Sequence, residues 1–194
     1  MLNMSRSIEL VELTNANYTE LLPLRNSNSY ILNCTHRKYA VSKEGLLHEF
    51  MRDFDQDRHK QVLVYYRSEN IIIGTIYSYS YSLADGYLFV TTYIADNYIN
   101  KGYGVETLLL FISWLLKLVP DLRKIYLDVY DFNLLSIKAM ERCGAKIEGR
   151  FHEHRLVPGY GYRDLLRFAF YMKDWGDEEV ARLLNHFEIL QKRR

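Results

Sequence analysis

The stretch that most constrains the fold is a strand, a glycine-containing loop and a helix in direct succession. The apolar run 87–94 is typical of a buried strand, and the apolar run 108–118 is typical of a helix. Between them lies the loop 98–107, Tyr-Ile-Asn-Lys-Gly-Tyr-Gly-Val-Glu-Thr. Gly102 and Gly104 let a ligand approach the backbone closely, and the first amides of the following helix have no intrahelical acceptor. Because those amides lie at the positive end of the helix dipole, the sequence predicts a phosphate or pyrophosphate site.

Composition places the chain among ordinary globular proteins. Its 194 residues are 48% hydrophobic and 25% charged, with a formal net charge of +1. The charge balance gives no sign of a nucleic-acid partner, and the apolar runs are too short for a membrane partner. Cys34 and Cys143 are far apart and lack metal-ligand spacing, so we expect no metal and no disulfide. This cysteine usage suits the cytoplasm.

Hydrophobic periodicity predicts one α+β domain over residues 1–194. The expected strands are 7–13, 61–67, 71–82, 87–94, 123–130, 146–156 and 162–172, and the expected helices are 17–26, 42–55, 103–118, 134–143 and 177–192. Short turns between three of the strands predict an antiparallel meander, and the strand–helix–strand unit implies a parallel crossover. We therefore expect a mixed central sheet of about seven strands with helices on both faces. The core would span about 7–175, with an extra C-terminal helix at 176–194.

Two apolar features leave the oligomeric state open. Tyr77, Tyr79 and Tyr81 fall on one side of a regular strand, which indicates a groove wall or a dimer contact, with a plain solvated strand as the alternative. The C-terminal helix carries an apolar stripe that predicts either docking within the chain or a homodimer.

Two common phosphate loops do not fit the sequence. A Walker A loop needs Gly-Lys followed by Ser or Thr, and this pair does not occur. A dinucleotide-binding loop would have a third glycine at position 107, where this chain has Thr107. That fold also requires a strand–helix–strand unit, whereas the chain before this loop is a β-meander.

Several short motifs occur in an order that resembles one family. They are Lys101-Gly-Tyr-Gly104, Asn133 with Ser136, Ala145-Lys-Ile-Glu-Gly149 and Tyr162-Arg-Asp164. Their order and spacing over about 7–175 resemble the GCN5-related N-acetyltransferases, and most closely the branch that includes ribosomal-protein N-terminal acetyltransferases. Ile99 stands where the family pattern has Gln or Arg.

The resemblance implies that acetyl-coenzyme A is the cosubstrate. The implied cofactor-binding residues are Ile94, Asn100, Lys101, Gly102, Tyr103, Gly104, Val105, Asn133 and Ser136. The strands before and after the loop–helix unit would separate, so that the pantetheine arm lies between them. We expect a β-bulge at 93–95 to cause that separation.

The implied reaction is direct acetyl transfer to a primary amine, which needs a base for the amine proton and an acid for the leaving thiolate. Many members of the family place a tyrosine at the position of Met140; in the ribosomal branch the acid is a serine, here Ser136. Asn133 and Ser136 could equally be helix caps. His154 and Glu153 are the base candidates, and regular alternation would put His152 and His154 on one face and Glu153 on the other.

The expected substrate residues are Tyr93, His152, Tyr160, Tyr162 and Asp164. Tyr160 and Tyr162 could flank an acceptor or pack against the protein, and Asp164 could order the substrate loop or pair with an arginine. The acceptor is left open between a protein N-terminus and a small amine such as a polyamine, an amino sugar or an antibiotic. The alternative function is a non-catalytic acyl-coenzyme A-binding or regulatory protein of the same fold.

Overall fold

The computed structural model describes residues 7–34, 40–54 and 60–192. Its strands are β1 (Ile8–Glu12), β2 (Gln61–Tyr66), β3 (Ile71–Ser82), β4 (Tyr87–Ile94), β5 (Lys124–Tyr130), β6 (Lys146–Val157) and β7 (Gly161–Tyr171). Its α-helices are α1 (Leu22–Arg25), α2 (Asn28–Cys34), α3 (Lys43–Phe54), α4 (Tyr103–Leu118), α5 (Leu134–Arg142) and α6 (Asp177–Lys192). All seven predicted strands are present, whereas α2 was not predicted.

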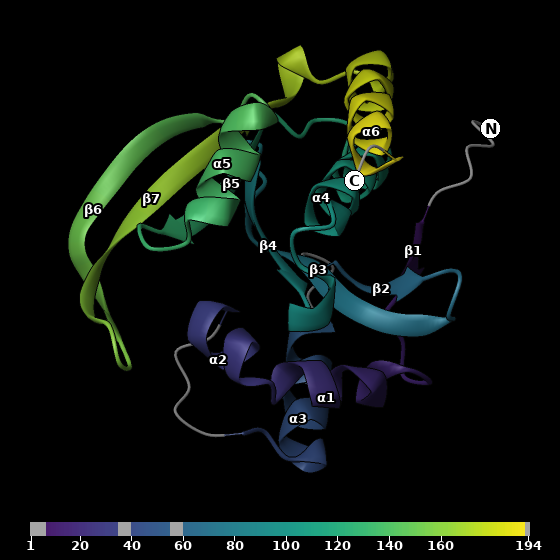
Figure 1. Cartoon of the computed structure of the whole chain (residues 1–194), viewed down its shortest axis with the longest axis vertical. Coiled ribbons are helices and arrows are strands. Elements are labelled where there is room, and N and C mark those ends of the chain that lie inside the picture. The colour runs from purple at the N-terminus through teal and green to yellow at the C-terminus, as the bar shows by residue number, and fades with distance from the viewer. Residues whose placement is uncertain (1–6, 35–39, 55–59, 193–194) are drawn as a thin grey trace.

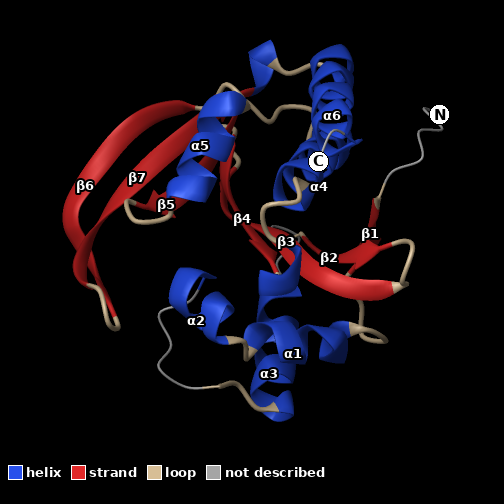
Figure 2. Ribbon diagram, viewed as in Figure 1, coloured by secondary structure: helices blue, strands red, loops and turns tan. Residues whose placement is uncertain are grey.

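The seven strands form one mixed sheet with the order β1-β2-β3-β4-β5-β7-β6. Strands β1 to β4 are antiparallel neighbours, as the short turns predict, and β4 and β5 are parallel because α4 crosses between them. Helices α4, α5 and α6 lie on one side of the sheet, and α1, α2 and α3 lie on the other (Figures 1 and 2). The predicted α+β class, with helices on both faces, is confirmed.

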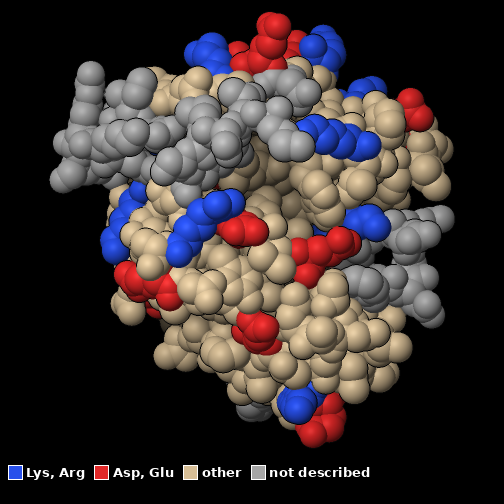
Figure 3. Space-filling model, turned by 90° about the vertical axis from the view of Figure 1, so that its right-hand side faces the viewer, with Lys and Arg blue, Asp and Glu red and all other residues tan. Residues whose placement is uncertain are grey.

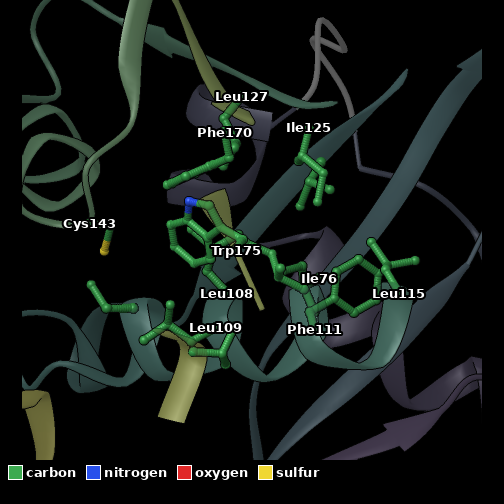
Figure 4. Close-up of a cluster of buried hydrophobic side chains, with 14 of the residues drawn as sticks. Ile76, Leu108, Leu109, Phe111, Leu115, Ile125, Leu127, Cys143, Phe170 and Trp175 are labelled. Atoms are coloured by element: carbon green, nitrogen blue, oxygen red, sulfur yellow. The ribbon is translucent and has the colours of Figure 1, made fainter. Parts of the chain in front are cut away.

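Helix α4 is the centre of the main core. It is apolar on most of its surface, and Leu108, Phe111 and Leu115 are fully buried against the sheet. Figure 4 shows these side chains beside Phe170 and Trp175, whose rings meet edge to face at 4.7 Å. Each such side chain contributes about 1.5–3 kcal/mol through burial. The core therefore fixes the position of the helix that follows the glycine loop.

The other face of the sheet carries a smaller core made with α1, α2 and α3. Leu63 and Tyr93 from the sheet pack there with Tyr30 of α2. The predicted break near Pro23 is seen as a 3-10 turn that leads into α1, where Pro23 occupies the first turn. Proline is tolerated at this position because the first helical N–H groups have no intrahelical acceptor. The predicted cap of α3 is also confirmed, since Ser42 Oγ accepts from Gly45 N–H at 3.1 Å.

Helix α6 packs against α4 (Figure 1). Val180, Leu183 and Leu184 are buried in the main core, so this part of the stripe docks within the chain. Two further stripe positions, 187 and 190, lie outside the described side chains.

The regular alternation predicted for β3 is wrong at its end. Tyr79 pairs with Phe89 but the next pair is Ser82 with Tyr87, and Ser80 between them has a φ of +50°. This bulge turns Tyr81 toward the main core, away from Tyr77 and Tyr79.

The surface mixes charges of both signs. Figure 3 shows basic and acidic side chains interspersed on one face of the molecule, without an extended region of one sign there. Such a distribution agrees with the formal net charge of +1. Within residues 7–34, 40–54 and 60–192, no helix is long and apolar enough to cross a membrane.

Candidate acetyl-coenzyme A site

Strands β4 and β5 lie side by side at one end and separate at the other. Their parallel pairing covers three positions, from Tyr87 opposite Lys124 to Phe89 opposite Tyr126. Beyond these positions, among the described strands, β4 pairs only with β3 and β5 only with β7. The predicted separation is therefore confirmed, and we call the space between the two diverging segments the gap.

The predicted bulge at 93–95 is wrong. The register between β3 and β4 stays regular from Tyr77 opposite Thr91 to Gly74 opposite Ile94. Each strand beside the gap keeps its hydrogen-bonded ladder with its outer neighbour, so the twist of the two half-sheets can separate them without a bulge in β4.

The glycine loop joins the open end of β4 to α4. Asn100 and Gly102 have left-handed backbone conformations, with φ of +62° and +88°, and Gly102 is the N-cap of α4. Within the described residues, the N–H groups of Tyr103 and Gly104 have no backbone acceptor. The loop thus presents donors at the positive end of a 16-residue helix.

The space around Gly104 bears on whether this loop can bind a diphosphate. A Cβ added there would meet, among the described residues, only Ile94 Cγ1, at 3.7 Å. Packing of the protein therefore does not require glycine at this position, and the open space suits the close approach of a ligand. Lys101 adds a cation, with its Nζ 5.1 Å from the ring centroid of Tyr98. The donors and the charge both fit a coenzyme A diphosphate.

Three other predicted cofactor residues have side chains packed against the protein. Ile94 contacts a small buried cluster beneath the loop, and Val105 is 8% exposed in the main core. The ring of Tyr103 lies 5.5 Å from that of Tyr66, and burial raises the pKa of Tyr103 to about 12. These residues can therefore face a ligand mainly through their backbone.

The N-terminus of α5 follows β5 as the glycine loop follows β4. Because β4 and β5 are parallel, both helix N-termini lie at the open end of the gap. Asn133 Oδ1 accepts from Ser136 N–H at 3.2 Å, which confirms that Asn133 caps α5. Ser136 is partly buried in the first turn, and Met140 is buried in the main core.

The three predicted residues of β6 lie in a bulge. Phe151 pairs with Leu165 and Arg155 pairs with Arg163, so β6 has extra residues between these pairs, and Glu153 has a φ of +46°. The predicted alternation of His152, Glu153 and His154 is therefore wrong. All three residues are exposed. Strand β7 separates them from β5, and two strand spacings are about 10 Å.

Asp164 holds this bulge. Its Oδ1 accepts from Glu153 N–H at 2.8 Å, while its Oδ2 accepts from Arg150 Nε at 2.6 Å and lies 3.1 Å from His152 Nδ1. The hydrogen bond from the Glu153 backbone and the Arg150 guanidinium lower the pKa of Asp164 to about 2. The predicted pairing with an arginine is confirmed.

Tyr93 is anchored between the sheet and α2. It is 6% exposed, and its hydroxyl lies 2.7 Å from Ser27 Oγ and 2.8 Å from Ser29 Oγ. Its ring meets that of Tyr30 at 5.0 Å. These contacts hold α2 against β4, so the described role of Tyr93 is to position that helix.

The two tyrosines of the β6–β7 hairpin differ. Tyr160 is 51% exposed and stacks on Phe132 at 4.7 Å, which in turn stacks on Tyr130 at 5.3 Å. The hairpin tip is thereby joined to the turn that precedes Asn133. Tyr162 is 65% exposed and has no ring contact among the described residues. Only Tyr160 of this pair is linked to the turn beside the gap.

A polar and aromatic cluster at the point where β4 and β5 begin to separate was not predicted. It lies on the side of the sheet where α2 packs, which we call the α2 face. Arg167 Cζ lies 4.8 Å from the ring centroid of Phe89, and the ring centroids of Phe89 and Tyr126 are 5.1 Å apart. Asp128 pairs with Arg167 because their strands place them directly opposite each other. Only the pairing of β5 with β7 brings these distant positions together.

Comparison with known proteins gives the family. A family model described as "Acetyltransferase (GNAT) domain" matches residues 8–146. No curated protein sequence matches the chain. One similar solved structure is a spermidine N-acetyltransferase from Vibrio cholerae in complex with CoA and spermine, with a TM-score of 0.78, 18% identity, and coverage of 86% of this chain and 96% of that chain.

Another is a ribosomal-protein-S5-alanine acetyltransferase from Vibrio fischeri, with a TM-score of 0.74, 17% identity, and coverage of 89% of this chain and 97% of that chain. At these identities the likeness concerns the fold. The matched family model covers the strands that diverge, the glycine loop and the helix that follows it. The chain belongs to the GNAT acetyltransferase family.

Proposed function

We propose that this protein transfers the acetyl group of acetyl-coenzyme A directly to a primary amine. The observation that carries the proposal is the gap between β4 and β5, which opens beside the glycine loop and the N-terminus of α4. Membership of the GNAT family supports acetyl transfer as the reaction type.

The proposed cofactor contacts follow from the two sides of the gap. The amides from Asn100 to Val105 would bind the diphosphate, with the Lys101 ammonium adding charge. Backbone groups of β4 and β5 that face the gap would bind the amides of the pantetheine arm, as a neighbouring strand would. Acetyl-coenzyme A supplies the activated thioester.

In the proposed transfer, the uncharged amine attacks the thioester carbonyl carbon, the C–S bond breaks, and the amine loses a proton. Ser136, in the first turn of α5, would give a proton to the leaving thiolate while Asn133 holds that turn in place. His154 or Glu153 would accept the amine proton through water, because β7 lies between their strand and β5.

The acceptor is a primary amine of either a protein N-terminus or a small molecule. Structural neighbours with both kinds of names support this breadth, since one is a spermidine N-acetyltransferase and another a ribosomal-protein-S5-alanine acetyltransferase.

Calorimetric titration with acetyl-coenzyme A tests the cofactor half of the proposal, and thiol release with a panel of peptides and small amines tests the transfer half. We expect saturable binding and turnover of at least one amine. Replacing Ser136 by Ala should lower kcat about 100-fold with little change in acetyl-coenzyme A affinity. Absence of saturable binding would contradict the proposal.

A second function, acyl-coenzyme A binding without turnover, is favoured by one observation. Met140, at the position where many family members have a tyrosine acid, is buried in the main core. Binding with no turnover across the whole panel would support this function, whereas turnover that falls sharply in the Ser136→Ala variant would exclude it.

A further inference from the structure

The carboxylates beside the gap are already paired. Asp128 accepts hydrogen bonds from Arg167 Nε and Nη2, both at 2.8 Å. Asp131 accepts from Arg163 Nε at 2.9 Å and from Arg163 Nη2 at 3.0 Å. A guanidinium bound in this two-point manner occupies both carboxylate oxygens. A polycationic acceptor would have to displace these arginines in order to use either acid.

Arg155 lies on the same face of the sheet as these ion pairs. It is directly opposite Arg163 in the β6–β7 ladder, and directly opposite residues point to the same side. Arg163 and Arg167 are on alternate positions of β7, so all three arginines project from the α2 face. The side chain of Arg155 thus shares a face with the cluster beside the gap.

Arg155 differs from the other two arginines in having no carboxylate partner within residues 7–34, 40–54 and 60–192. It is nevertheless partly buried. A guanidinium that is partly removed from water gains most when an anion satisfies its fork of donors. Arg155 is therefore a positive charge on the α2 face that no described carboxylate neutralises.

Two phenols on the α2 face are influenced by this charge. Burial raises the pKa of Tyr79 and of Tyr130, and the positive charge of Arg155 opposes the rise at both. Tyr79 is on β3, which adjoins β4, and Tyr130 ends β5. Both influences agree with a guanidinium on the α2 face, where the β6–β7 ladder places Arg155.

We propose that the acceptor amine carries a carboxylate and that Arg155 binds this carboxylate. The proposal rests on the proposed acetyl transfer and names its substrate class. It follows from the paired state of Asp128 and Asp131, and from the position of Arg155 on the α2 face, which is opposite the face that carries α4 and α5 (Figure 1). Polyamines lack an anionic group and would meet an unfavourable charge at Arg155.

The test measures thiol release from acetyl-coenzyme A with matched acceptors. Straight-chain ω-amino carboxylates of several lengths are each compared with the alkylamine that lacks the carboxylate. Spermidine and two peptides that differ only by Glu or Lys near the N-terminus complete the panel. We expect kcat/KM to be at least about tenfold higher for a carboxylate-bearing acceptor than for its matched amine, as one ion pair with a guanidinium provides.

Variants assign that preference to Arg155. Arg155→Gln should raise KM for the favoured acceptor about tenfold and remove its advantage, while KM for acetyl-coenzyme A and turnover of the matched alkylamine stay unchanged. Arg155→Lys should restore part of the advantage. Arg142→Gln, on the exposed last turn of α5, removes the same charge elsewhere and should leave the preference intact.

The outcomes separate the two proposals. Equal turnover of both partners, preference for spermidine, or an equal loss with every acceptor in Arg155→Gln would overturn the role of Arg155 and leave acetyl transfer standing. No turnover of any amine would overturn the proposed transfer and this inference with it.

Discussion

The two ends of the β4–β5 pair differ although the same strands form both. At the closed end, Phe89 and Tyr126 lie directly opposite each other with their rings 5.1 Å apart, and Arg167 stacks on both. At the open end the two strands share no ladder, and a helix N-terminus follows each of them. A short ladder and side-chain contacts hold the closed end together, whereas the open end presents backbone groups without a strand partner across the gap.

This difference indicates a division of roles. Cross-strand side-chain contacts stabilise the closed end, so changes there should mainly affect the free energy of unfolding. Backbone donors dominate the open end, so changes there should mainly affect ligand affinity.

The largest expected effect is at the open end. Gly104→Leu should weaken acetyl-coenzyme A binding about 100-fold, or about 2.7 kcal/mol, because the side chain occupies the space beside the loop amides. The free protein should remain as stable as the unmodified chain, since Leu is a better helix former than Gly. Calorimetry and urea unfolding measure the two quantities.

Gly176 provides the matched control. It lies at the start of another helix, directly before α6, and nothing described lies within 4 Å of an added Cβ there. Gly176→Leu should leave acetyl-coenzyme A affinity unchanged. If the Gly104→Leu variant and the unmodified chain bound acetyl-coenzyme A with equal affinity, the glycine loop would not be part of the binding site.

The reverse pattern is expected at the closed end. Phe89→Ala removes a partly buried ring from contact with Tyr126 and Arg167. We expect the free energy of unfolding to fall by about 2 kcal/mol. Acetyl-coenzyme A affinity, measured where the variant is fully folded, should change less than threefold. If Phe89→Ala instead lost much of its acetyl-coenzyme A affinity with unchanged stability, the proposed division of roles between the two ends would be wrong.

A smaller effect is expected where the hairpin meets the turn before α5. Tyr160→Ala removes the stack on Phe132 and should lower stability by about 1 kcal/mol. Tyr160→Phe should retain the stack, and Tyr162→Ala, on the same hairpin without a ring contact in the described residues, should stay within about 0.5 kcal/mol. Similar losses in both alanine variants would show that the stack contributes nothing specific.

The smallest effect concerns acid stability of the bulge in β6. Because the folded pKa of Asp164 is about 2, below its ordinary value of 3.8, the carboxylate favours folding above pH 3.8. That contribution is lost as pH falls from about 4 to about 2. Asp164→Asn should therefore flatten the fall in stability across this range, as measured by urea unfolding at several pH values. Parallel curves for the two proteins would contradict this role.

Local patterns in the sequence were enough to predict most of the fold. Alternating runs predicted the strands, and the apolar run after Gly104 predicted α4, because burial on a sheet demands those patterns. Helix α2 was missed because long-range contacts hold it, among them the hydrogen bonds between the Tyr93 hydroxyl and those of Ser27 and Ser29. A seven-residue segment held by such contacts carries little periodic signal.

The candidate site divides in the same way. The glycine loop and the Asn133 cap were predicted, because each is formed by residues that are close together in the sequence. The bulge at Glu153 depends on Asp164, and the Asp128–Arg167 pair depends on strand order. Neither contact has a local signature, since each joins residues on different strands of the sheet.

The central claim is that backbone groups of β4 and β5 remain without a strand partner until a ligand enters the gap. Amide hydrogen exchange by NMR measures this directly for 90–94 and 127–130. We predict that, in each segment, the amides not bonded to β3 or β7 exchange rapidly in the free protein and at least about tenfold more slowly with saturating acetyl-coenzyme A. Slow exchange of these amides in the free protein, or unchanged exchange on saturation, would contradict the account.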